Sequence, residues 1–361
     1  MTPISGYLEV FEKGYGFLRS IEDNLRPSSD DPFVPAQIIK KWGLAEGAFI
    51  QGAGTKGHGK NQNLKLSRIE TVNGASPEDH RSVRTLQDGT SIDPSSRLRM
   101  SRGSDDLMGR ALDWIVPVGR GQRGLVISPP KTGKTTILKH MAGSILDHHP
   151  ETQVYVLLVD ERPEEVTDFK RSMEGACVLH SSADQTITQH KRIARFAMNI
   201  AIRCAEAGQD AVVLIDSLTR MARAFNADTR SYGRTMSGGI AANALEIPRR
   251  IFGAARKIED GGSLTVIATI LVDTGSRMDD IIYQEFKGTG NMDLVLSRKC
   301  AEQRVWPAIN INDSGTRKEH LLMSDAEYKE VVEARRWLSQ RDEVSAMSSL
   351  LEYFDAHRDI D

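Results

Sequence analysis

Ser128-Pro129-Pro130-Lys131-Thr132-Gly133-Lys134-Thr135 is the stretch of this 361-residue sequence that decides its fold. It follows the apolar run 125–127 and precedes the helical pattern 136–141, which is the strand–loop–helix context of a phosphate-binding loop (P-loop). In such a loop the backbone N–H groups bind phosphates, Lys134 adds positive charge, and the Thr135 hydroxyl can ligate Mg²⁺. The stretch therefore predicts a nucleotide site, although Ser128 stands where the pattern has its first glycine.

Further apolar runs follow the loop at 154–159, 211–215 and 264–268. Near-continuous apolar runs of this kind are typical of parallel strands that are buried on both faces. Helical patterns lie between the runs and again near the C-terminus. The alternation predicts an α/β motor domain with a parallel sheet over residues 108–361.

The N-terminal part has a different pattern. Short alternating segments at 6–11, 15–19 and 48–52 are separated by Gly, Pro, Asp and Ser clusters, which predicts a small all-β domain over residues 1–72. We assign residues 73–107 to a linker or connector between the two domains.

Two of the apolar runs end in carboxylates, at the strand ends where open α/β sheets bind ligands. Asp216 follows one run and has the position of the acid that holds Mg²⁺ or its water. Glu161 ends another run, and we predict that it is the general base for the attacking water. The surrounding acidic run also fits a solvated surface, and we interpret Glu164 and Glu165 in that way.

Two further segments are ambiguous from the residues alone. Gly119-Arg120-Gly121-Gln122-Arg123-Gly124 fits a turn as well as it fits a nucleotide contact. Arg317 lies in the polar loop 313–319, and such an arginine could reach the γ-phosphate of an adjacent subunit. Taken by itself, Arg317 is more readily a surface residue.

An aromatic strand marks the small domain. Alternation places Tyr15, Phe17 and Arg19 on one face and Leu18 on the other. Aromatic rings two residues apart beside a base suit stacking of unpaired bases, as in oligonucleotide-binding and cold-shock barrels. Phe33 could extend that surface. A hydrophobic core strand is an equally good interpretation of this motif alone.

The overall composition excludes several classes of protein. The net charge is −2, so the whole chain lacks a nucleic-acid signature. Cys177, Cys204 and Cys300 are far apart, which argues against a disulfide framework or a zinc site and fits a reducing cytoplasm. No apolar run approaches the ~20 residues that span a bilayer. We expect a soluble, cytoplasmic protein without a membrane partner.

The order of the motifs carries a resemblance. The chain contains, in this order, GYGFLRS, GRGQRG, PPKTGKT, VDERPEEVT, LIDSLTRMARAFN, GGSLTVIATILVDTGSRMDD, EFKGTGNMDLVLSRK and SGTRKEH. Together these motifs closely resemble the bacterial transcription termination factors of the Rho family. Members of that family are ring-shaped homohexameric, RNA-dependent ATPases with a RecA-like motor behind an OB- or cold-shock-like barrel.

The resemblance implies ATP and Mg²⁺ as cofactors and assigns roles to the motor residues. Glu161 resembles the catalytic base, Lys134 the P-loop lysine, Asp216 the acid that holds Mg²⁺ with Thr135, and Arg317 the finger that acts on a neighbouring subunit. The implied nucleotide contacts are Gly119, Arg120, Gly121, Gln122, Arg123, Gly124, Lys131, Thr132, Gly133, Lys134, Thr135, Thr136, Arg162 and the sensing residue Arg220.

Single-stranded RNA is the implied partner of both domains, and the RNA polymerase elongation complex is a candidate partner. The implied primary RNA site in the barrel contains Gly14, Tyr15, Gly16, Phe17, Leu18, Arg19, Asp31, Pro32, Phe33, Lys60, Asn61 and Gln62. The implied channel loops contain Thr235, Ser237 and Gly238, and Lys287 and Gly288. The implied activity is ATP-dependent RNA translocation, or helicase activity, that terminates transcription.

The chain departs from the family pattern in two places. The sequence starts almost at the barrel, so we expect it to lack the helical N-terminal subdomain common in the family. Gln62 stands where many relatives have an aromatic residue, so we expect a weak primary RNA site or an altered preference for pyrimidines.

Two other classes of protein fit part of the pattern. One is a RecA-like ring ATPase of another kind, such as a DNA translocase or a rotary-ATPase subunit, but the GYGF strand and the EFKGTG loop argue against it. The other is a non-catalytic RNA-binding regulator that holds a nucleotide. The presence of Glu161, Lys134 and Arg317 argues against this second class.

Overall fold

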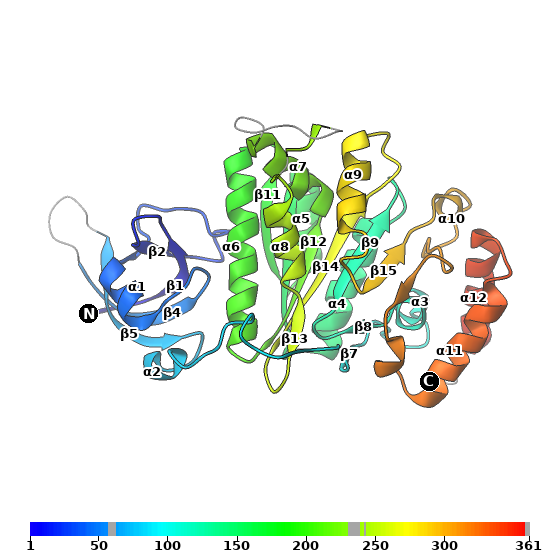
Figure 1. Cartoon of the computed structure of the whole chain (residues 1–361), viewed down its shortest axis with the longest axis horizontal. Helices are drawn as coiled ribbons and strands as arrows, with labels where there is room; N and C mark the ends of the chain where they lie inside the picture. The colour runs from blue at the N-terminus through cyan, green and yellow to red at the C-terminus, as the bar shows by residue number, and fades with distance from the viewer. Residues whose placement is uncertain (57–62, 230–238, 242, 358–361) are drawn as a thin grey trace.

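The computed structural model describes residues 1–56, 63–229, 239–241 and 243–357. In this part of the chain a small barrel lies beside a larger α/β domain, and the long helix α6 stands between the barrel and the sheet (Figure 1).

The described strands are β1 (Thr2–Val10), β2 (Gly16–Arg19), β3 (Phe33–Val34), β4 (Phe49–Lys56), β5 (Leu64–Val72), β6 (Ser91–Ile92), β7 (Arg97–Leu98), β8 (Val118–Gly119), β9 (Arg123–Ser128), β10 (Gln153–Glu161), β11 (Cys177–Ser182), β12 (Asp210–Asp216), β13 (Arg256–Ile258), β14 (Ser263–Leu271), β15 (Met292–Val295) and β16 (Gly315–Thr316). The described helices are α1 (Ala36–Trp42), α2 (Pro77–His80), α3 (Leu107–Ile115), α4 (Lys134–His148), α5 (Pro163–Ser172), α6 (Ile187–Glu206), α7 (Leu218–Thr229), α8 (Glu246–Gly253), α9 (Arg277–Phe286), α10 (Arg298–Glu302), α11 (Asp325–Leu338) and α12 (Glu343–Ala356), with a 3₁₀ turn at Glu319–Leu321.

The N-terminal domain is a closed barrel in the strand order β1-β2-β3-β5-β4. Its interior is filled by apolar side chains that alternate with outward-facing ones, among them Leu8, Leu18, Ile50 and Leu66, all fully buried. Gly16 lies against β1, where a Cβ atom would stand 2.4 Å from the carbonyl oxygen of Glu9. Only glycine fits this close approach. The closed barrel confirms the predicted small N-terminal barrel, although helix α1 is inserted between β3 and β4.

The motor domain contains the predicted parallel sheet, in the order β11-β10-β12-β14-β9-β15, and β16 pairs antiparallel with β15. Helices α6, α7 and α9 pack on one face, and α3, α4, α5 and α12 belong to the core on the other face. Both faces are therefore covered, which explains why the strand sequences are almost continuously apolar. The predicted fold class is confirmed.

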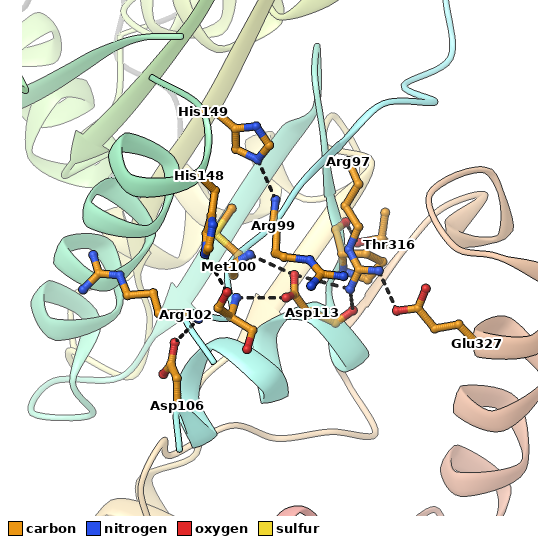
Figure 2. Close-up of polar contacts among 12 residues, drawn as sticks. Arg97, Arg99, Met100, Arg102, Asp106, Asp113, His148, His149, Thr316 and Glu327 are labelled. Carbon is orange, nitrogen blue, oxygen red and sulfur yellow. Dashed lines mark hydrogen bonds and ion pairs between the residues drawn. The ribbon is translucent and has the colours of Figure 1, made fainter. Parts of the chain in front are cut away.

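The connector runs along the motor domain. Its strand β6 pairs with β13, and its strand β7 pairs with β8. The buried carboxylate of Asp113 in α3 accepts hydrogen bonds from the backbone N–H groups of Met100 (3.0 Å) and Ser101 (2.9 Å), and Arg97 reaches Glu327 in α11 at 2.6 Å (Figure 2). These contacts attach the connector to helices α3 and α11 of the motor domain.

No helix in the described ranges is long and apolar enough to cross a membrane.

Candidate functional site

The predicted P-loop joins the carboxyl end of β9 to the first turn of α4. Gly133 caps the helix with φ at 88°, and Lys131 also has a positive φ of 65°. The Ser128 hydroxyl lies 2.8 Å from the Thr132 hydroxyl, which in turn donates to the Pro129 carbonyl oxygen at 2.7 Å. Ser128 therefore braces the loop at the position where the usual pattern has glycine. The free N–H groups at the start of α4 make this a phosphate-binding end of the helix.

Two buried carboxylates face the P-loop lysine. Nζ of Lys134 lies 2.6 and 2.7 Å from the two carboxylate oxygens of Asp216 and 3.7 Å from Glu161. The Thr269 hydroxyl on the adjacent strand β14 also donates to Asp216, at 2.8 Å. The ends of β9, β10 and β12 thus bring Lys134, Glu161 and Asp216 together, as the apolar runs and their terminal acids predicted.

Glu161 has the environment of a general base. Its side chain is 1% exposed, and neither carboxylate oxygen has a hydrogen-bond partner in the described part of the chain. Burial, followed by the negative charge of Asp216, raises the pKa of Glu161 above its ordinary value. Nε of Arg220 lies 3.3 Å away and limits that rise. A carboxylate with free oxygens and raised proton affinity is suited to accept a proton from water.

The residues present also fit a nucleotide with Mg²⁺. Glu161 lies near the charges of Arg220 and Lys134 but accepts no hydrogen bond in the described part of the chain, so a water or another donor can bind its oxygens. In the same place, Lys134 and the start of α4 supply positive potential, while Thr135 and Asp216 supply the oxygen ligands that Mg²⁺ prefers. Arg162 follows Glu161 and is the N-cap residue of α5. Its side chain is exposed and therefore available to a ligand.

Other predicted contacts lie at the opposite end of the sheet. Gly119–Gly124 runs from the end of β8 into the start of β9, and Thr316, next to Arg317, pairs with Met292 at the level of Gly124. A six-residue strand such as β9 is about 20 Å long, so the exposed Arg317 is remote from the P-loop of its own chain.

The Gly119–Gly124 turn is held by contacts within the motor. Arg120 forms ion pairs with Asp210 and Glu151, and Gln122 donates to the side chain of Asn291 at 2.8 Å. Burial and the charges of Arg256 and Arg317 lower the pKa of Arg123 below its ordinary value. The turn therefore lies beside Arg123, Arg256 and Arg317 and is separate from the P-loop end.

Sequence reasoning missed Trp306, which stands beside the P-loop with 41% of its surface exposed. A largely apolar cavity of about 210 Å³ lies between Trp306, Gly133, Thr136 and Met108. A Cβ atom on Gly133 would come within 3.1 Å of the Trp306 ring. No motif marks Trp306 in the sequence, because it follows β15 and α10 in the chain and reaches the P-loop only through the fold.

The barrel carries an exposed group of aromatic rings. Phe17 lies 5.8 Å from Phe11, 6.0 Å from Tyr15 and 5.7 Å from Phe33, measured between ring centroids. All four are exposed or half-buried, whereas Leu18 points into the barrel core. We call Phe11, Tyr15, Phe17 and Phe33 the aromatic surface. Phe11 was not among the predicted site residues.

Four of the predicted RNA contacts in the barrel are buried, namely Gly16, Leu18, Arg19 and Asp31. Arg19 and Asp31 are 3% and 7% exposed and form an ion pair with each other. Pro32 is half-buried, and its carbonyl oxygen accepts a hydrogen bond from the backbone of Leu18 at 2.9 Å. Arg19 thus supports the aromatic surface from below and does not offer an exposed guanidinium to phosphate.

The remaining predicted RNA contacts fall partly within and partly outside the described residues. Lys287 and Gly288 follow α9 and are exposed. The other predicted residues, Lys60, Asn61, Gln62, Thr235, Ser237 and Gly238, lie outside the described residues.

Comparison with known proteins supports both domains. Residues 109–316 match the nucleotide-binding domain of the ATP synthase alpha/beta family, and residues 4–78 match the RNA-binding domain of the Rho termination factor. A similar solved structure is a prototypical ATPase from the type III secretion system of pathogenic bacteria. It has a TM-score of 0.62 at 20% identity over 77% of this chain and 78% of that one, which shows the motor fold. The chain is thus an ATPase with an RNA-binding barrel.

Curated relatives give the family. The transcription termination factor Rho of Haemophilus influenzae is 46% identical over 96% of this chain and 83% of its own length. That of Aquifex aeolicus is 45% identical over 97% of this chain and 81% of its own length. The chain belongs to the Rho transcription termination factor family, as the motif order predicted.

Proposed function

We propose that this protein hydrolyses ATP in a homohexameric ring, moves along single-stranded RNA and terminates transcription by acting on the nascent transcript. The observation that carries this proposal is the joining, in one chain, of the Lys134–Glu161–Asp216 site to a barrel with an exposed aromatic surface. Aromatic rings bind unpaired bases by stacking at about 1–3 kcal/mol per base. One barrel binds weakly, so several barrels on one RNA strand would supply the affinity.

Within the proposed mechanism, Glu161 accepts the proton of the attacking water while Lys134 leaves Asp216 for the phosphates. Thr135 and Asp216 would hold Mg²⁺, which when bound neutralises phosphate charge. Trp306 and the adjacent apolar cavity suit a nucleobase, because a flat ring and an apolar wall exclude water from it.

The proposed ring is head to tail. Arg317 and the P-loop lie at opposite ends of the sheet, so a P-loop would be completed by Arg317 of a neighbouring subunit. A heterologous interface of this kind generates a ring when its rotation closes. A finger contributes about 10³–10⁵-fold to the rate in related phosphoryl transfers, so hydrolysis would depend on assembly.

One assay tests the proposal: ATP hydrolysis by wild type and Lys134→Ala, each with no nucleic acid, with single-stranded RNA and with single-stranded DNA. We expect RNA to stimulate the wild type and Lys134→Ala to be inactive throughout. Stimulation by DNA alone would favour a DNA translocase, and no stimulation by either would refute the RNA motor.

A mixing experiment tests the shared site. Lys134→Ala subunits keep Arg317, and Arg317→Ala subunits keep Lys134, so each variant alone should be inactive. Random mixing in a ring would restore about a quarter of the interfaces, because each working interface needs one subunit of each kind in the right order. Absence of any recovered activity in mixed rings would contradict a finger supplied by a neighbour.

A further inference from the structure

A network of buried charges lies directly beneath the aromatic surface of the barrel. Nε of Arg19 donates to Oε2 of Glu9 at 2.6 Å, and the other side of the same guanidinium pairs with Asp31. Cζ of Arg19 also lies 5.0 Å from the centroid of the Phe17 ring. A base that stacks on the Phe17 ring therefore presses on a ring whose other contacts include the Arg19 guanidinium.

The same Glu9 carboxylate is bound by the motor domain. Arg192 in α6 donates from Nε to Oε1 of Glu9 at 2.5 Å and from a terminal nitrogen to Oε2 at 2.9 Å. That nitrogen also donates to the Leu25 carbonyl oxygen at 2.7 Å. Although burial opposes ionisation of Glu9, the bonds from Arg192 and Arg19 lower its pKa below the ordinary value. The carboxylate thus connects the two domains as an ion, and it is only 4% exposed.

His190 lies two residues before Arg192 in α6. Side chains two positions apart on a helix are rotated by about 200°, so His190 faces the sheet while Arg192 faces the barrel. His190 is 5% exposed, and its Nδ1 lies 2.8 Å from the Ser181 hydroxyl of β11. Its Nε2 lies 3.9 Å from Oδ1 of Asp160, at the end of β10.

Asp160 is the residue that redirects β10 immediately before Glu161. The pairing of β10 with β11 shifts between Val159 and Glu161, and Asp160 has a φ of 58°, which is the geometry of a β-bulge. The Asp160 carbonyl oxygen accepts a hydrogen bond from Arg220, whose Nε contacts Glu161. A bulge beside a site re-aims the side chain that follows it, here the carboxylate of Glu161.

We propose that the first turns of α6 couple RNA on the aromatic surface to the aim of Glu161, with Arg192 and His190 as positioning residues. The inference rests on the proposed function, because it assigns to α6 the means by which RNA stimulates hydrolysis. Displacement of Arg19 and Glu9 moves Arg192, and α6 transmits this movement through His190 to the Asp160 bulge. The side-chain polar contacts of Arg192 and His190 go to the barrel, to Ser181 and to Asp160, and none goes to the P-loop in the described part of the chain.

The test is steady-state ATP hydrolysis by the full chain, with and without saturating single-stranded RNA. For Arg192→Gln we expect the RNA-stimulated kcat to fall at least about fivefold, the lower end of typical coupling between sites. The KM for ATP, the rate without RNA and the affinity for RNA should not change. For His190→Gln we expect kcat to fall both with and without RNA, at unchanged KM for ATP, because His190 contacts the bulge itself.

Two variants serve as controls. Arg195→Gln removes another contact between α6 and the barrel, the 3.1 Å ion pair of Arg195 with Glu46. The Arg195 side chain is 58% exposed and does not contact Glu9. This variant should keep full stimulation. Arg192→Lys retains a charge beside Glu9 but not the two-pronged contact, so it should recover part of the stimulation.

The outcomes separate the coupling from the proposed function. If the wild type is not stimulated by RNA, the proposed function fails. If the wild type is stimulated and Arg192→Gln matches Arg195→Gln, the coupling through α6 is refuted. The coupling is also refuted if Arg192→Gln and Arg192→Lys lose stimulated rate, basal rate and thermal stability in equal measure, since the contact would then only hold the domains together.

Discussion

Glu161→Gln is the most informative single substitution in the motor. Glutamine has the shape of glutamate but cannot accept the proton of the attacking water. General-base catalysis is worth about 10²–10⁴-fold, so kcat should fall by that factor. ATP binding should persist, because Lys134 and the P-loop are unchanged. The matched control is Glu164→Gln, the same chemical change at an exposed position in the first turn of α5.

The same substitution should stabilise the nucleotide-free protein in a pH-dependent way. Burial and the charge of Asp216 raise the pKa of Glu161 from 4.5 to about 8. Between these values the folded state binds more protons at Glu161 than the unfolded state does, so stability falls as pH rises through this window. Each tenfold change in proton affinity corresponds to about 1.4 kcal/mol, so the cost that glutamine avoids should reach at least that size.

The assay is thermal unfolding of wild type, Glu161→Gln and Glu164→Gln at pH 6 and pH 9, beside kcat at each pH. We expect the melting temperature of Glu161→Gln to exceed that of the wild type by a margin that grows from pH 6 to pH 9. Glu164→Gln should show neither the margin nor the loss of kcat. A pH-independent margin, or a Glu161→Gln enzyme with more than about a tenth of wild-type kcat, would refute the reasoning about this carboxylate.

Three further outcomes follow from the geometry. Phe17→Ala should weaken binding of single-stranded RNA about 5- to 150-fold, the equivalent of 1–3 kcal/mol for one stacked base, in a fluorescence anisotropy titration; equal affinity would show that the ring is structural. Trp306→Ala should raise the KM for ATP more than it lowers kcat, because it removes a wall of the base cavity; a loss confined to kcat would contradict that role. Asp113→Ala should lower the free energy of unfolding by about 1–3 kcal/mol for each of the two backbone N–H groups it leaves without an acceptor, measured by urea denaturation; an unchanged midpoint would mean that water replaces the carboxylate.

The sequence predicted those parts of the fold that depend on local pattern. The apolar runs 154–159, 211–215 and 264–268 became β10, β12 and β14, because a strand buried on both faces has few polar positions. Their terminal acids, Glu161 and Asp216, could be placed beside the P-loop since parallel strands end at one edge of the sheet.

The remaining features depend on contacts between distant segments. Alternation placed Arg19 on the face of Phe17, but its burial follows from Glu9 and Asp31, which come from two other segments. Trp306 carries no motif, and its place beside Gly133 depends on the path of the chain after β15. The Gly119–Gly124 turn lies close to the P-loop in sequence, yet the whole length of β9 separates them in space.

The distribution of charge argues that the nucleotide site is completed between subunits. At the carboxyl end of the sheet, Lys134 is ion-paired with Asp216, so its charge is already matched before any phosphate binds. At the other end, burial and then the charges of Arg256 and Arg317 lower the pKa of Arg123, and a group of arginines of this kind favours an anion. The P-loop lysine is therefore occupied within its own subunit, whereas the exposed Arg317 forms no ion pair in the described part of the chain. Head-to-tail contact between two copies would relieve both conditions at once, which a two-fold dimer would not do, because it would bring like ends together.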